Sequence, residues 1–135
     1  MGWYEGIQDR IFQSFLILLK GSEKYPGRTL LDVGCGLGDF IPYLRHCGFR
    51  DLKYCGIDFV KEMVRAARKK YPGYDFAHMD FTEPGFKKKF DYIVCSGALS
   101  IVMADTPSEH LKYVKKFIRK MYRLCSRGCA VSLNS

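Results

Sequence analysis

Three aspartates and a run of glycines are the residues whose types and spacing could recognise a ligand in this sequence. Asp32 precedes the turn Gly34-Cys35-Gly36-Leu37-Gly38, and Asp58 and Asp80 follow further along the chain. Glycine lets a backbone approach a ligand where a Cβ atom would collide. The two oxygens of a carboxylate can accept hydrogen bonds from both hydroxyls of a ribose, or from the exocyclic amine of adenine. The pattern therefore indicates a nucleoside-containing ligand.

The elements expected to position these residues alternate between strand and helix. Apolar runs predict strands over 29–33, 54–57, 75–79, 90–95 and 129–133, and apolar stripes predict helices over 7–19, 39–47, 60–71 and 107–124. Five strands separated by helices predict an α/β fold with a doubly wound, mainly parallel sheet and helices on both faces. Ligands of such sheets bind beyond the carboxyl ends of the strands. Asp58 and Asp80 are expected at such ends.

Helix caps give further expectations. Asp39 or a neighbour is expected to cap the helix that follows the glycine turn. The segment Thr106-Pro107-Ser108-Glu109 has the pattern of a capping box with proline at the first helical position. Gly128 is expected to end the helix that this box begins.

The glycine spacing discriminates between nucleotide ligands. A dinucleotide fingerprint reads G-x-G-x-x-G, whereas here Gly34, Gly36 and Gly38 give G-x-G-x-G. A P-loop is excluded because no G-K-[ST] follows the glycines. Asp32 could reach a cationic amino group, which a pyrophosphate does not offer. A ligand with an amino-acid end and an adenosine end suits this combination.

On these residues the sequence resembles the class I S-adenosylmethionine-dependent methyltransferases of Rossmann-like fold. Leu31–Asp39 is similar to their first motif, Tyr54–Asp58 to their second-strand motif, Phe76–Phe81 to their third and Phe90–Gly97 to their fourth. The resemblance covers roughly residues 28–135. It implies S-adenosylmethionine as cofactor and S-adenosylhomocysteine as product. The implied reaction moves a methyl group from the sulfonium to an O or N acceptor by in-line displacement.

The resemblance also implies which residues would contact the cofactor. They are Asp32, Gly34, Cys35, Gly36, Gly38, Asp58, Phe59, Asp80, Phe81, Ser96 and Gly97. Asp32 and the glycine turn would hold the methionine moiety, with Cys35 contributing backbone groups rather than a nucleophile. Asp58 would accept the ribose hydroxyls. Phe59 would pack on the adenine, and Asp80 with Phe81 would meet its amine edge.

Ser96 and Gly97 would form the floor near the sulfonium. Cys95-Ser96-Gly97-Ala98 departs from the Asn-Pro-Pro-Tyr pattern of family members that methylate adenine or glutamine nitrogens, which disfavours that subclass. The three histidines are better explained as structural or solvated residues, so no catalytic base is assigned. An acceptor that is already deprotonated would need none.

Composition narrows the partners. The chain has 22 basic and 14 acidic residues, a formal charge of +8, which favours anionic ligands. Aromatic residues are not interleaved with the basic face of 107–124, so a small-molecule acceptor is favoured over RNA. Six cysteines without a C-x-x-C pair predict free thiols and no metal site. No apolar stretch is long enough to span a membrane, and the cytoplasm is the expected location.

Two regions and two alternatives complete the interpretation. Residues 1–27 are expected to form an N-terminal cover helix with Trp3-Tyr4-Glu5 as a lid, and 28–135 the cofactor-binding core. The family continues with further strands after the fifth, which this chain lacks, so we expect the edge of the fifth strand to pair in a homodimer. The alternatives are a non-catalytic cofactor-binding module or truncated core and, less favoured, an NAD-dependent oxidoreductase.

Overall fold

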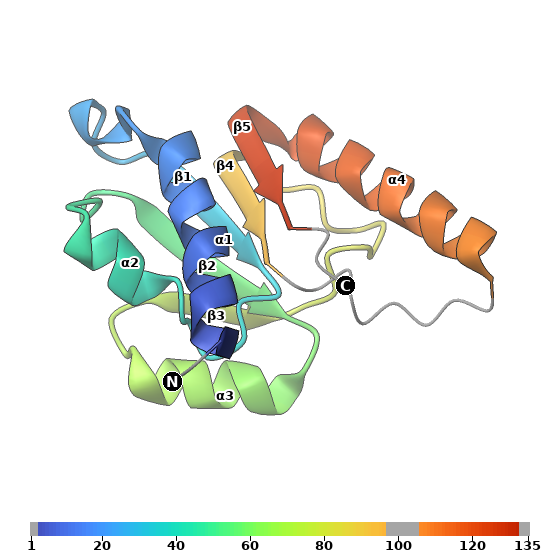
Figure 1. The fold of residues 1–135 in the computed structure, drawn as a ribbon, viewed down its shortest axis with the longest axis horizontal. Helices are drawn as coiled ribbons and strands as arrows, with labels where there is room; N and C mark the ends of the chain where they lie inside the picture. The colour runs from blue at the N-terminus through green and yellow to red at the C-terminus, as the bar shows by residue number, and fades with distance from the viewer. Residues whose placement is uncertain (1–2, 97–105, 133–135) are drawn as a thin grey trace.

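A five-stranded parallel sheet forms the centre of the protein (Figure 1). The computed structural model describes residues 3–96 and 106–132, with the side chains of 3–5 excepted. The strands are β1 (Thr29–Val33), β2 (Lys53–Asp58), β3 (Asp75–His78), β4 (Phe90–Cys95) and β5 (Cys125–Val131). Their order is β3-β2-β1-β4-β5, and every pair is parallel. The predicted doubly wound α/β sheet is confirmed.

Helices cover both faces of this sheet. They are α1 (Trp3–Leu19), α2 (Ile41–His46), α3 (Lys61–Lys70) and α4 (Pro107–Leu124), with a short 3₁₀ turn η1 (Ser22–Lys24) after α1. One hydrophobic core joins α1, α2 and α3 to one face, and a second joins α4 to the other. In Figure 1, α1 crosses in front of the strands while α4 lies beside β5. No helix within the described residues is long and apolar enough to cross a bilayer.

The carboxyl ends of β1, β2 and β3 meet at one edge of the sheet. Asp32 pairs in register with Gly56, and Asp58 pairs with His78. The chain therefore leaves β1 into the glycine turn beside the end of β2. The order reverses at β1, whose neighbours are β2 and β4, and such a reversal opens a crevice for ligands.

The start of β5 differs from the prediction. The strand begins at Cys125, directly after α4, and Gly128 lies within it opposite Tyr92. A Cβ atom on Gly128 would lie 2.7 Å from Leu18 Cδ1, so this residue has no side chain because α1 packs directly on the strand. The prediction that Gly128 ends a helix was wrong for that reason.

The starts of α4 and α2 lie where the sequence predicted them, at Thr106 and at the neighbour of Asp39, but only α4 has a side-chain cap. Thr106 is the N-cap of α4, and its Oγ1 accepts a hydrogen bond from the Glu109 amide over 3.1 Å, as predicted. At α2 the N-cap is Phe40 rather than Asp39, and no side chain caps the helix. The Phe40 ring is fully buried and packs against Phe12 of α1, so core packing rather than a carboxylate fixes where α2 begins.

Candidate cofactor-binding site

The glycine turn is held against the end of β2 by backbone hydrogen bonds. The amides of Gly34 and Cys35 both donate to the Ile57 carbonyl, over 2.8 and 3.0 Å. Gly36 and Gly38 adopt φ angles of +55° and +81°, in the left-handed region that glycine occupies without strain. Apart from the chain neighbours of Gly36, no atom of the described residues lies within 4 Å of the position that a Cβ on Gly36 would take, so the turn is open there. The backbone is thus accessible to a ligand at this point.

Asp58 connects the turn to the start of α3. Its Oδ2 accepts from the Gly36 amide and its Oδ1 from the Val60 amide, each over 2.9 Å. Asp58 is buried, with 8% of its surface exposed, and the two hydrogen bonds fix the orientation of its carboxylate. Each carboxylate oxygen has a second lone pair, which leaves room for one ribose hydroxyl per oxygen.

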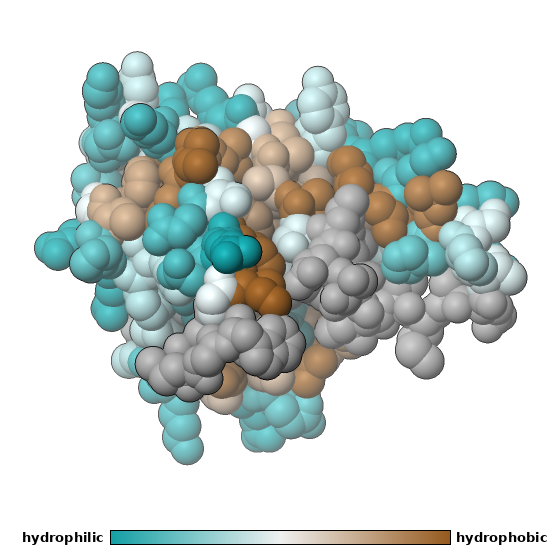
Figure 2. All heavy atoms as spheres, viewed as in Figure 1, coloured by the Kyte–Doolittle hydropathy of each residue, from teal (hydrophilic) through white to brown (hydrophobic). Residues whose placement is uncertain are grey.

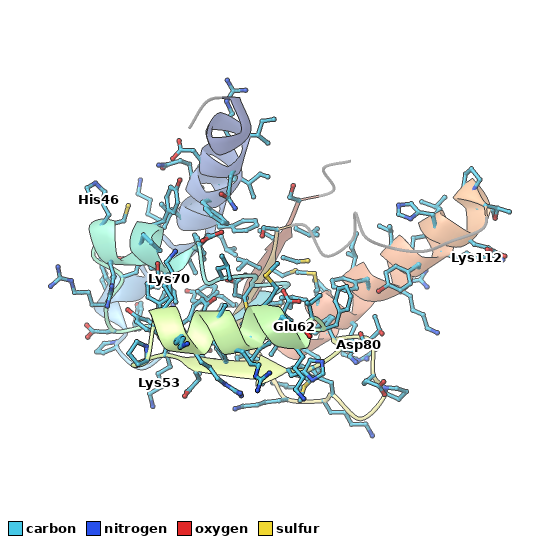
Figure 3. All side chains as sticks on the ribbon, turned by 90° about the horizontal axis from the view of Figure 1, so that it is seen from below. His46, Lys53, Glu62, Lys70, Asp80 and Lys112 are labelled. Atoms are coloured by element: carbon cyan, nitrogen blue, oxygen red, sulfur yellow. The ribbon has the colours of Figure 1, made fainter. Side chains whose placement is uncertain are left out.

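A pocket lies beyond the carboxyl ends of β1, β2 and β3. Five of the predicted site residues line it: Gly34, Asp58, Phe59, Asp80 and Phe81. The rest of its wall consists of residues that were not predicted: Val33, Ile57, Met79, Tyr113 and Phe117. Figure 3 shows Asp80 near α4, the helix that contributes Tyr113 and Phe117 to this pocket. The structure therefore brings half of the pocket wall together from motifs far apart in the sequence.

The two phenylalanines of the pocket differ in exposure. Phe81 is buried at 3% and packs on Phe117 with ring centroids 4.9 Å apart, whereas Phe59 is 48% exposed. The Phe59 carbonyl lies 3.0 Å from His78 Nε2, a contact that links the loop after β2 to the end of β3. An exposed ring beside an aromatic wall is suited to stacking on a planar base.

Asp80 shapes the turn after β3. Its Oδ1 accepts from the amide of Thr82 over 2.9 Å and from the Thr82 hydroxyl over 2.6 Å. The side chain is exposed and lies on the pocket wall. It can therefore accept a further hydrogen bond from a ligand amine.

Asp32 lies behind the turn rather than on the pocket wall. It is 2% exposed, and its Oδ2 accepts from the Tyr54 hydroxyl over 2.6 Å. Its Oδ1 has no hydrogen-bond partner among the described residues. Burial raises the pKa of the Asp32 carboxyl to about 7, the Tyr54 hydrogen bond opposes this, and the charges of Asp58 and Asp39 add to it. A buried oxygen without a partner is costly unless a cationic group or water meets it.

Cys35 and Ser96 also lie outside the pocket wall. The Cys35 thiol is buried, and burial followed by the nearby Asp32 raises its pKa well above the ordinary value, so it stays protonated. Ser96 is half-buried after β4. Gly97 and the predicted lid side chains Trp3, Tyr4 and Glu5 lie outside the described residues. No group of three or more metal-ligating side chains occurs in the part of the chain that the structure describes.

Tyr113 and Phe117 are the pocket residues that sequence reasoning missed most clearly. They lie four residues apart on α4, so they share one face of that helix. The i, i+4 aromatic pair was a usable signal. Only the tertiary structure shows that this face meets Phe81 at the end of the sheet.

The residues present fit an S-adenosyl ligand. An open glycine turn, the Asp58 carboxylate with unused lone pairs and the exposed Phe59 ring lie at the strand ends, and they offer the types of contact that an amino-acid end, a ribose and a base need. The unpartnered Asp32 Oδ1 lies under the turn, where a cationic amino-acid end would approach.

Comparison with known proteins defines the family. Residues 30–128 match the model of the methyltransferase domain. The chain is 32% identical over 101 residues to putative methyltransferase Rv1506c of Mycobacterium tuberculosis and 31% identical over 100 residues to putative methyltransferase 235L of Invertebrate iridescent virus 6. It therefore belongs to the class I S-adenosylmethionine-dependent methyltransferases.

A solved structure supports the fold independently. An S-adenosylmethionine-dependent methyltransferase from Clostridium acetobutylicum superposes with a TM-score of 0.62 at 21% identity, over 87% of this chain and 46% of that one. The alignments with the two relatives cover 74% and 73% of this chain, and 59% and 37% of the relatives. The chain thus spans roughly a third to three fifths of the length of these two relatives.

Proposed function

We propose that this protein transfers a methyl group from S-adenosylmethionine to an O or N atom of a small-molecule acceptor. The observation that carries the proposal is the pocket in which Gly34, Asp58 and Asp80 meet at adjacent strand ends. Each of these residues offers the type of contact that one part of the cofactor needs.

The protein's contribution would be positioning. S-adenosylmethionine, when bound, supplies an activated methyl group on a sulfonium. Asp58 would orient the ribose through its two oxygens, which the Gly36 and Val60 amides already hold in place. Phe59 would cover the base, and Asp80 would accept from its amine. Holding the acceptor in line behind the methyl group can supply much of the rate enhancement without a general base.

The remaining predicted contacts belong to the same proposal. Asp32 would meet the amino-acid end from beneath the turn, and Ser96 and Gly97 would lie near the sulfonium. Residues 1–27 would cover the site; α1 supports this because Phe12, Phe15 and Leu19 anchor it in the core of the sheet. A cytoplasmic location is supported by the six free cysteines, since free thiols persist in reducing compartments.

We also propose a homodimer through β5. This strand lies at the end of the strand order, and its residues are only partly buried. In Figure 2, tan and brown residues lie between α1 and α4, over β5. Sedimentation equilibrium should show a dimer; a monomer at all concentrations would count against it.

Calorimetric titration tests the cofactor assignment. S-adenosylmethionine and S-adenosylhomocysteine should bind, and NAD should not. Transfer of labelled methyl groups to a metabolite extract should then reveal an acceptor, and transfer to an RNA pool should not. Binding of NAD alone would overturn the proposal. Cofactor binding without transfer to any extract would replace it with that of a binding module.

A further inference from the structure

A second cavity, which neither the family resemblance nor the motifs anticipate, adjoins the cofactor pocket. It has a volume of about 620 Å³ and lies between α4 and the loop that joins β3 to β4. Its lining residues are Phe81, Thr82, Pro84, Tyr113, Lys116, Phe117, Arg119, Lys120 and Arg123. We call it the basic groove. A cavity of this size holds a small molecule of a few rings.

The charged residues of the basic groove all have one sign. Lys116, Arg119, Lys120 and Arg123 are cationic, and no acidic residue lines the groove among those described. They lie on successive turns of α4, so their side chains converge along one face of the helix. Like charges this close repel one another unless an anion lies between them. An anionic ligand in the groove would balance the charge of its lining residues.

Lys120 is held in place rather than left to solvent. Its Nζ donates to the Glu83 carbonyl over 2.7 Å and lies 5.2 Å from the ring centroid of Phe81 and 5.6 Å from that of Phe86. Burial lowers the pKa of Lys120, the neighbouring Arg123 lowers it further, and Asp80 and Glu83 oppose the change. An anion in the groove would relieve this repulsion.

The floor of the groove is apolar and aromatic. Phe81 and Phe117 are buried with their rings in contact, and Tyr113 lies 6.1 Å from Phe117 between ring centroids. Such a floor accepts the face of a flat, apolar ring, whereas a bare inorganic anion would leave it uncovered. The aromatic floor suits an apolar ring, and the cations suit an anionic group on the same ligand.

We propose that the basic groove binds a small aromatic molecule that carries a phosphate or a similar anionic group. The ring lies against Tyr113, which is only partly buried, with the buried Phe81 and Phe117 behind it, and the anionic group lies among the α4 cations. Phe81, Tyr113 and Phe117 also line the cofactor pocket, so the two ligands share a wall. If binding in one cavity changes the affinity of the other, the effect is reciprocal and of the same factor.

Matched probes test the inference. 1-Naphthyl phosphate and 1-naphthol share a ring system and differ in charge. Each probe is titrated calorimetrically into protein whose cofactor pocket is saturated with S-adenosylhomocysteine. 1-Naphthyl phosphate should bind at least tenfold more tightly than 1-naphthol. Raising the salt concentration should weaken only the phosphate. Equal affinities for the two probes would overturn the proposal, as would tight binding of inorganic phosphate alone.

Paired variants locate the site. Arg119→Gln with Arg123→Gln removes two groove cations, and Arg65→Gln with Lys69→Gln removes two exposed cations from α3 on the other face of the sheet. Both pairs lower the net charge equally. The α4 pair should weaken naphthyl phosphate at least tenfold, and the α3 pair less than twofold. Equal effects would refute a specific groove.

Two further readouts complete the test. S-adenosylhomocysteine should bind both double variants, which shows that they fold and separates failure of this inference from failure of the proposed methyl transfer. A short oligouridylate should bind no more tightly than naphthyl phosphate. An oligouridylate that binds more tightly and is released by the α4 pair would assign the groove to RNA and overturn the small-molecule proposal.

Discussion

The Tyr54 hydroxyl donates a 2.6 Å hydrogen bond to Asp32 Oδ2 in the interior of the protein, while Asp32 Oδ1 has no partner among the described residues. Tyr54 lies on β2 and Asp32 on the neighbouring β1, so the pair bridges the two strands that frame the glycine turn. The bond favours the charged form of Asp32, but burial outweighs it and sets the pKa near 7. The Asp32 carboxyl is therefore a buried group that titrates near neutral pH.

The first prediction concerns the pH dependence of stability. The Asp32 carboxyl has a pKa of about 7 in the folded protein, against 3.8 as its ordinary value. The folded state therefore binds the proton more tightly, and this stabilisation is complete below pH 3.8 and lost as the pH rises through 7. Relative to wild type, Asp32→Asn should gain about 1.4 kcal/mol in unfolding free energy per pH unit between pH 5 and 7.

Urea unfolding at several pH values measures this difference. Tyr54→Phe provides the companion variant, because removing the hydrogen bond raises the Asp32 pKa further and extends the loss of stability to higher pH. Parallel stability profiles for wild type and Asp32→Asn would contradict the assignment.

Gly56 of β2 is the second test. A Cβ atom there would lie 2.9 Å from Cys35 Cβ, Cys35 Sγ and Phe76 Cδ1, closer than packed atoms approach. Gly56→Ala should therefore lower the unfolding free energy by about 1–3 kcal/mol. Gly73→Ala is the control, since nothing lies within 4 Å of its Cβ position, and it should be neutral or slightly stabilising. Equal urea midpoints for the two variants would show that Cys35 does not pack as described.

The sequence could predict Asp58 and Asp80 because their placement follows from topology alone. Parallel strands bring their carboxyl ends to one edge, so residues that follow successive strands must lie together. Strand alternation could also have placed Asp32. It lies on the same face as Leu30, opposite the face of Leu31 and Val33, and only that second face borders the pocket.

The parts that sequence reasoning missed depend on contacts between distant segments. Tyr113 and Phe117 reach the pocket only because α4 packs on Phe81, about 30 residues earlier. The prediction that β5 begins at residue 129 was wrong, because it required Gly128 to end the preceding helix. Its actual role is to admit Leu18 of α1, a contact that no local pattern reveals.

The third prediction compares Asp58→Asn, which should weaken cofactor binding, with Asp91→Asn, which should lower only the stability of the fold. Asp58→Asn leaves one acceptor oxygen where the Gly36 and Val60 amides need two, so one amide loses its acceptor and at most one ribose hydroxyl can still be accepted. We expect its affinity for S-adenosylhomocysteine to fall at least tenfold. Asp91→Asn acts at the opposite ends of the strands, where the carboxylate accepts from the Thr29 amide over 2.9 Å and the Ser126 hydroxyl over 3.0 Å.

Asp91→Asn should lower the unfolding free energy by about 1 kcal/mol through a lost hydrogen bond and leave the cofactor affinity unchanged. Calorimetric titration and urea unfolding of both variants measure the two effects. Unchanged affinity in Asp58→Asn would refute the ribose assignment.

The last prediction concerns the start of α4, the helix that contributes to both cavities. Thr106 Oγ1 accepts a hydrogen bond from the Glu109 amide and so caps this end of the helix. Thr106→Ala should lower the unfolding free energy by about 1 kcal/mol, whereas Thr106→Ser keeps an acceptor oxygen and should change it little. Ser108→Ala, an exposed change in the same first turn that leaves the cap bond in place, is the matched control. If Thr106→Ala and Thr106→Ser lost stability equally in urea unfolding, the hydroxyl would not be the cap, and packing of α4 on the sheet alone would fix where the helix begins.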